Sequence, residues 1–117
     1  MLSIIKRKKK LLDGLIDFHN HILPNLDDGS KNNTESMKML KLFEELGITK
    51  LIPSPHIFKE LYPNTEKKIK KSFDDFGKVL IRKKTNVELL DYTAEYMVDE
   101  FLIKKIIENH SFKSFKN

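Results

Sequence analysis

The chain has 117 residues, which is the size of one domain, with 39% hydrophobic and 33% charged residues and a net charge of +5. It has no cysteine and no apolar run of the roughly 18 residues that a membrane span needs, so disulfides, thiolate catalysis and an integral membrane protein are excluded. The composition predicts a soluble globular domain, and the missing cysteine fits a reducing, cytoplasmic setting.

A basic cluster stands near the N-terminus, because residues 6–10 are all lysine or arginine. We expect residues 1–13 to form a basic leader appended to the domain. A run of this kind can contact nucleic acid or anionic lipid. Here it is short and has no interleaved aromatic residue, so the favoured interpretation is a solvated leader, and no nucleic-acid partner is expected.

The first half of the domain reads as strand, helix, strand. Residues 14–18 predict a short buried strand. A helix follows, with Asn32 as its cap, Glu35 three residues later and Gly47 at its end. Residues 48–52 are apolar and predict a second strand. The prolines at positions 53 and 55 cannot donate hydrogen bonds, which predicts that His56 lies just beyond this strand.

The second half repeats the order. Apolar residues at helical spacing predict a helix from Glu66 onward, Thr85 and Asn86 break it, and residues 87–90 predict a third strand. Asp99 opens a last helix, and residues 109–117 predict a disordered tail. The alternation predicts an α/β fold over residues 14–108, with about three parallel strands joined by crossover helices.

Side chains that bind metals follow each predicted strand. His19 and His21 are two apart on an extended backbone, so their rings project to the same side. His56 and Glu95 follow the second and third strands, and the carboxyl ends of parallel strands share one rim. Asp27 and Asp28 add carboxylate oxygens. This mixture of nitrogen and oxygen donors suits Mn, Fe or Zn better than Ca.

Four segments carry a resemblance to a known family. They are residues 17–29, Asp-Phe-His-Asn-His-Ile-Leu-Pro-Asn-Leu-Asp-Asp-Gly; Pro55-His56; residues 61–65, Leu-Tyr-Pro-Asn-Thr; and residues 94–100, Ala-Glu-Tyr-Met-Val-Asp-Glu. Over roughly residues 14–102 the chain resembles the polymerase-and-histidinol-phosphatase (PHP) superfamily. Within that superfamily it is most similar to the bacterial manganese-dependent tyrosine-protein phosphatases associated with capsule and exopolysaccharide production.

The resemblance implies a fold and a metal centre. Members of the superfamily are distorted (β/α) barrels with two or three divalent metal ions at the C-terminal rim, so this chain is expected to form a partial barrel. By resemblance His19 and His21 bind a first metal, Glu95 bridges it to a second, and Asp28 with His56 serves a third position. The second aspartate of the Asp-Asp pair matches the motif, so Asp27 is the less favoured ligand.

The resemblance also implies an activity. It points to a metal-dependent phosphoester hydrolase that uses Mn²⁺, with Fe or Zn as alternatives, and acts on a phosphotyrosine protein such as a bacterial tyrosine kinase. The family's chains are about twice this length, typical of a complete barrel. We therefore expect the N-terminal half of a barrel, of doubtful activity alone, with a sheet edge open to self-association.

Two other functions stay open on the sequence. One is a small-molecule phosphatase of the histidinol-phosphate type, because the segments that set specificity are not among the recognised motifs. The other is an inactive remnant that acts as a binding module through its basic leader.

Overall fold

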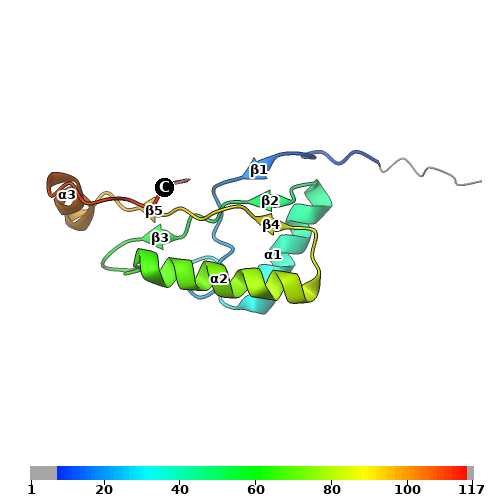
Figure 1. Ribbon diagram of the computed structural model, residues 1–117, viewed down its shortest axis with the longest axis horizontal. Coiled ribbons are helices and arrows are strands. Elements are labelled where there is room, and N and C mark those ends of the chain that lie inside the picture. The colour runs from blue at the N-terminus through cyan, green and yellow to red at the C-terminus, as the bar shows by residue number, and fades with distance from the viewer. Residues whose placement is uncertain (1–7, 116–117) are drawn as a thin grey trace, which may run out of the picture.

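A computed structural model describes residues 8–115 of the chain (Figure 1). Residues 1–7 of the predicted leader and residues 116–117 of the predicted tail lie outside the described part. The elements in chain order are β1 (Ile16–Asp17), α1 (Asn33–Leu46), β2 (Lys50–Leu51), β3 (His56–Ile57), α2 (Glu66–Lys83), β4 (Glu88–Leu89), β5 (Glu95–Tyr96) and α3 (Glu100–Ile107).

The strands form two small parallel sheets. One has the order β1-β2-β4, and the other pairs β3 with β5. In Figure 1, α1 and α2 lie on the same side of the strands and connect β1 to β2 and β3 to β4. The predicted α/β fold with three parallel strands and crossover helices is confirmed. Each of the three strands is shorter than predicted, and β3 and β5 were not predicted.

His56 lies beyond the end of β2, as predicted from the two prolines. The unpredicted feature is that His56 begins a further strand, β3, and pairs with Glu95 of β5. Proline lacks an N–H, but its carbonyl still accepts. The carbonyls of Pro53 and Pro55 accept hydrogen bonds from the backbone N–H groups of Thr93, at 2.8 Å, and Glu95, at 2.9 Å. The prolines therefore interrupt the ladder and do not end it.

One strand carries an extra residue between β4 and β5. The N–H of Leu90 donates to the carbonyl of Leu51 at 2.9 Å, and the next bond runs from Thr93 to Pro53. Between these two bonds one strand advances three residues, from Leu90 to Thr93, while its partner advances two, from Leu51 to Pro53. This difference of one residue defines a β-bulge. The bulge shifts the register by one residue between the two sheets.

The bulge changes which residues face the helices. Before it, Val87 and Leu89 pack with the hydrophobic core, and after it Ala94 and Tyr96 do so. Side chains alternate between the two faces of a strand, so the core-facing positions change from odd to even numbers. Glu95 consequently points away from the core.

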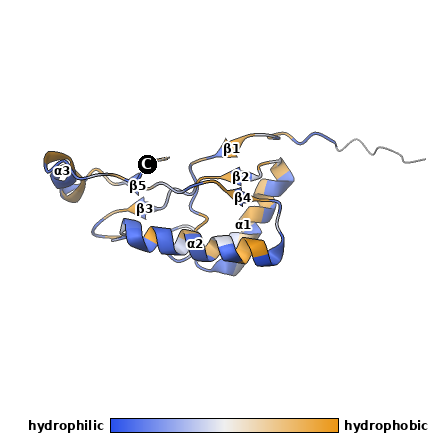
Figure 2. Ribbon diagram, viewed as in Figure 1, coloured by the Kyte–Doolittle hydropathy of each residue, from blue (hydrophilic) through white to orange (hydrophobic). Residues whose placement is uncertain are grey.

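The core lies between the strands and the two helices. Ile22 and Leu23 from the loop after β1, Leu40 of α1 and Phe76 of α2 are at most 1% exposed. The predicted ends of α1 are confirmed, since the side chain of Asn32 accepts from the N–H of Glu35 and Gly47 ends the helix at φ 100°. By contrast, no residue of α3 is buried, and its ribbon is partly apolar at the far end of the molecule (Figure 2).

The described parts of both terminal segments contact the domain. The N–H of Leu12 donates to the carbonyl of Leu46 at 2.9 Å, which holds the end of the leader against α1. In the predicted tail, Lys113 is 9% exposed, and its ammonium lies 3.1 Å from a carboxylate oxygen of Asp91. This ion pair packs residues that the sequence predicted to be frayed. Among the helices of residues 8–115, none combines the length and the apolar character needed to cross a bilayer.

Candidate metal centre

The loop after β1 holds the first two histidines. A carboxylate oxygen of Asp17 accepts from the N–H of His19 at 3.1 Å and from the side-chain amide of Asn20 at 2.9 Å. Asn20 is buried, and its N–H donates to the hydroxyl of Ser54 at 3.1 Å. His19 and His21 flank Asn20 in the sequence, and the centroids of their rings lie 5.9 Å apart.

Asp27 is the fixed centre of the same loop. Its side chain is fully buried, and its carboxylate lies 2.7 Å from Nδ1 of His21. It also accepts from the N–H of His56 at 2.8 Å and from the N–H of Gly29 at 3.0 Å. Asp27 therefore ties the first histidine segment to β3. A carboxylate bonded to the far nitrogen of a metal-binding histidine is a common orienting arrangement.

Two further residues keep the loop in place. The side-chain amide of Asn64 donates to the carbonyls of Leu26 and His56, both at 2.8 Å, and Asn64 is buried. Gly29 lies directly against His21, because a Cβ atom on Gly29 would lie 2.3 Å from the carbonyl oxygen of His21. The loop thus closes around His21 with no space for a larger residue.

Glu95 is where the histidines converge. Its Oε2 atom lies 3.2 Å from Nε2 of His19, 3.2 Å from Nε2 of His21 and 3.4 Å from Nδ1 of His56. The three rings come from the loop after β1 and from β3. One carboxylate oxygen from β5 is therefore shared by three imidazoles, as a bridging ligand would be.

Asp28 forms the second side of the centre. Its carboxylate lies 3.4 Å from Nε2 of His56 and is 61% exposed, in contrast to the buried Asp27. Two overlapping groups have donor atoms close enough to hold a metal ion. They are His19, His21 and Glu95, and His21, Asp27, Asp28 and His56.

The protonation of His21 decides how these groups are used. The carboxylate of Asp27 accepts only, so its 2.7 Å contact with Nδ1 of His21 uses a proton on that nitrogen. The other ring nitrogen, Nε2, lies 3.2 Å from Oε2 of Glu95 and is the nitrogen placed to bind a metal ion together with that oxygen. Imidazole nitrogens and carboxylate oxygens are the donors that Mn, Fe and Zn use, so the residues fit a divalent metal.

The structure brings all five predicted metal ligands together. His19, His21 and Glu95 surround one position, and Asp28 and His56 flank it. Asp27 already accepts from three donors, whereas Asp28 is exposed, and both belong to one of the two groups whose donor atoms could hold a metal ion. The sequence did not reveal that Asp27 orients His21.

Sequence reasoning also missed two residues next to His56. Tyr62 stacks on the His56 ring, with centroids 5.6 Å apart and an interplanar angle of 13°. Asn64, two residues further on, bonds the carbonyl of His56. Both lie in the 61–65 segment that carried the resemblance. Their contacts cross from a loop to a strand, so no local periodicity indicates them.

Comparison with known proteins agrees with this geometry. Residues 15–113 match the family model described as capsular polysaccharide synthesis, CpsB/CapC. The chain is 32% identical over 76 residues to the tyrosine-protein phosphatase YwqE of Bacillus subtilis, and 36% identical over 56 residues to the putative tyrosine-protein phosphatase CapC of Staphylococcus aureus. These alignments cover 65% and 48% of this chain.

A solved structure shows the same fold. It comes from a description of YwqE from Bacillus subtilis and CpsB from Streptococcus pneumoniae as unique metal-dependent tyrosine phosphatases. The TM-score is 0.70, with 26% identity over 82% of this chain. The matched part spans 30% of YwqE, 22% of CapC and 38% of the solved chain. Because the family model matches most of the sequence, the chain belongs to the CpsB/CapC family of capsular polysaccharide synthesis.

Proposed function

We propose that this chain carries metal ligands of a metal-dependent phosphatase that acts on phosphotyrosine in proteins. The observation that supports this most strongly is Glu95, whose Oε2 lies within 3.4 Å of nitrogens of three histidines. Three imidazole nitrogens around one carboxylate oxygen are a donor set that a divalent cation can use. The relatives named as tyrosine phosphatases, one described as metal-dependent, support the reaction class.

The roles of the residues follow from their contacts. His19, His21 and Glu95 would hold one divalent ion, Glu95 would bridge to a second, and Asp28 with His56 would complete the set. When bound, such ions supply Lewis acidity toward a phosphoryl group and acidify water. The carboxylate of Asp27 would keep the imidazole proton on Nδ1 of His21, so that Nε2 is the nitrogen that binds the metal ion. No side-chain nucleophile is required.

The proposed metal is Mn²⁺, with Fe and Zn as alternatives that the donor set also accepts. The proposed substrate is a phosphotyrosine protein, and a bacterial tyrosine kinase is one substrate of this class to test. The proposed setting is the cytoplasm. His19 and Asp28 are both more than 60% exposed, which leaves the centre open to a group on the surface of a large substrate.

Calorimetric titration with Mn²⁺ tests the metal centre. We expect the chain to bind Mn²⁺, and we expect the double variant His19→Ala, His21→Ala to bind it at least about tenfold more weakly, since two of the converging donors are lost. The matched control is His110→Ala. His110 is exposed and contacts only Glu108 among the described carboxylates. Equal binding by the double variant and the wild type would remove the metal centre.

Turnover with added Mn²⁺ tests the substrate class. We expect any activity on a phosphotyrosine peptide to disappear in the same double variant. Histidinol phosphate is assayed beside it, and faster turnover of that compound would favour the small-molecule alternative. The chain covers 38% or less of the length of the relatives reported above. Its turnover is therefore compared with that of a full-length relative, and metal binding is the primary measurement.

We also propose self-association through β1. Among the described residues β1 pairs only with β2, and Phe18 beyond its end is 70% exposed. The open edge of such a strand, with an exposed apolar residue beside it, is a template for pairing with another chain. We expect light scattering after size exclusion to show an oligomer that Phe18→Lys reduces. Ile81→Lys, at an equally exposed apolar residue of α2, should leave it unchanged, and a monomeric wild type would refute the proposal.

A further inference from the structure

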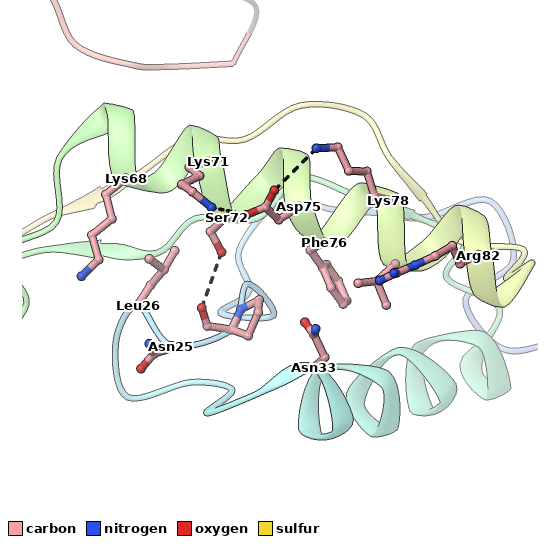
Figure 3. Close-up of a pocket in the computed structure, with 12 residues that line it drawn as sticks. Asn25, Leu26, Asn33, Lys68, Lys71, Ser72, Asp75, Phe76, Lys78 and Arg82 are labelled. Atoms are coloured by element: carbon pink, nitrogen blue, oxygen red, sulfur yellow. Dashed lines mark hydrogen bonds and ion pairs between the residues drawn. The ribbon is translucent and has the colours of Figure 1, made fainter.

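A long groove lies between α1 and α2, away from the metal centre. It consists of two adjoining cavities of about 650 and 390 Å³, which share Asn33 and Val79. In Figure 3, α2 forms one wall of the larger cavity, the start of α1 forms the other, and the loop with Asn25 and Leu26 closes one end. None of the candidate metal ligands lines either cavity.

The groove concentrates the positive charge of the chain. Seven cations line the two cavities, against a single carboxylate, that of Asp75. The cations are Lys38, Lys41, Lys68, Lys71, Lys78, Arg82 and Lys83. The formal charge of this lining is +6, compared with +5 for the whole chain. The groove is therefore a basic feature of the domain, separate from the basic cluster at residues 6–10.

Most of these cations are not neutralised. Asp75 pairs with Lys71 and lies 3.7 Å from Lys78 (Figure 3). The hydrogen bond from Lys71 holds the pKa of Asp75 below its ordinary value, so its carboxylate stays charged. No described carboxylate forms an ion pair with Lys68 or Arg82. In Figure 3 the Lys68 side chain extends toward the loop with Leu26, and the Arg82 side chain runs back along α2 toward Phe76.

The floor of the groove is apolar. Phe76 and Val79 of α2 and Met37 of α1 lie between the charged walls. Phe76 is the sole aromatic residue among the lining residues, and it is 1% exposed. Single-stranded nucleic acid is held largely by stacking on exposed aromatic rings, which this groove does not offer. A bilayer surface is flat and would not contact cations on both walls of a concave site.

We infer that this groove binds an extended acidic segment of a partner protein, with its carboxylates on the lysine walls. Six of the seven cations are lysines. Lysine is a mobile point charge and accepts carboxylates at varied positions, whereas bidentate phosphate recognition favours arginine. The two adjoining cavities are lined by both helices, and their combined shape fits an extended peptide better than a small ion. The proposal is independent of the metal centre.

Fluorescence anisotropy with a labelled peptide of glutamate and leucine residues tests this surface. We expect salt-sensitive binding that weakens about tenfold or more when Lys68 and Arg82 are both changed to Glu, because two attractions become repulsions. The same loss is expected for Lys38→Glu with Lys41→Glu on the other wall. The matched control is Lys8→Glu with Lys9→Glu in the leader, which makes the same change of charge and should bind normally.

The outcomes separate the alternatives. Loss on both walls with an unchanged leader variant supports the groove. Loss in the leader variant, loss on one wall alone, or equal binding by all variants overturns it. Tighter binding of single-stranded DNA or of vesicles with anionic lipid also overturns it, since each identifies another class of partner. Circular dichroism melting of every variant confirms that folding is retained, and all substituted residues are exposed.

Discussion

Replacing Asp27 with alanine is expected to lower the free energy of unfolding by about 3 kcal/mol, because buried donors lose their acceptor. The N–H groups of His56 and Gly29 and Nδ1 of His21 all lie within 3.0 Å of this carboxylate. Urea unfolding followed by circular dichroism measures the loss. Mn²⁺ affinity should fall about 10- to 100-fold as well, because His21 loses its orienting partner.

Asp28→Ala is the matched control for Asp27→Ala. The neighbouring side chain is 61% exposed and faces only imidazoles, so its loss should change the free energy of unfolding by no more than about 0.5 kcal/mol. Its Mn²⁺ affinity should still fall, because Asp28 is a proposed ligand. If the two variants had the same stability, the assignment of Asp27 as the organising carboxylate would be wrong.

Gly29→Ala is expected to be as damaging, for a steric reason. The added Cβ would lie 2.3 Å from the carbonyl oxygen of His21 and 2.4 Å from its Cβ, and neither atom is the end of a flexible side chain. The loop must therefore shift, which we expect to cost about 3 kcal/mol of unfolding free energy. The urea midpoint should fall, and the Mn²⁺ affinity should fall with it as His21 moves.

Gly77→Ala supplies the contrast within the same chain. Gly77 lies inside α2, and a Cβ there meets nothing within 4 Å. Alanine favours the helix over glycine, so this variant should gain about 0.5–1 kcal/mol in unfolding free energy and keep its Mn²⁺ affinity. A neutral Gly29→Ala would show that the loop can open without cost.

The helices were predictable because their signals are local. Asn32 and Glu35 begin α1, Gly47 ends it, and Thr65 caps α2 by accepting from the N–H of Lys68. Each of these contacts spans a few residues. Periodic apolar residues then indicate which side of α1 and of α2 is buried, whereas the apolar residues of α3 are not buried.

The convergence of the candidate ligands was predictable because parallel strands deliver their ends to one edge. His19 and Glu95 are 76 residues apart and lie 3.2 Å from each other. Alternation of strands and helices indicates that such residues meet. It does not indicate how they are held, and the burial of Asp27 or the bond from Asn64 to His56 depends on loops whose path has no periodic signal.

The strand breaks were hidden for a different reason. The proline rule concerns the missing N–H and says nothing about the carbonyl, so the sequence did not indicate that a further strand, β3, begins at His56 directly after Pro53 and Pro55. The extra residue between Leu90 and Thr93 could not be predicted either, because no residue type at these positions requires a bulge.

That extra residue determines which side chains of β5 face the three histidines. If the same sequence ran on in the register of β2 and β4 with no bulge, Ala94 would lie opposite His56 and Glu95 would turn inward against the helices. The candidate metal centre therefore depends on a residue that is not among its predicted ligands. Deleting one residue between Leu90 and Thr93 removes the bulge and shortens the chain by the same step, so that variant should keep Glu95 opposite His56 and keep its Mn²⁺ affinity.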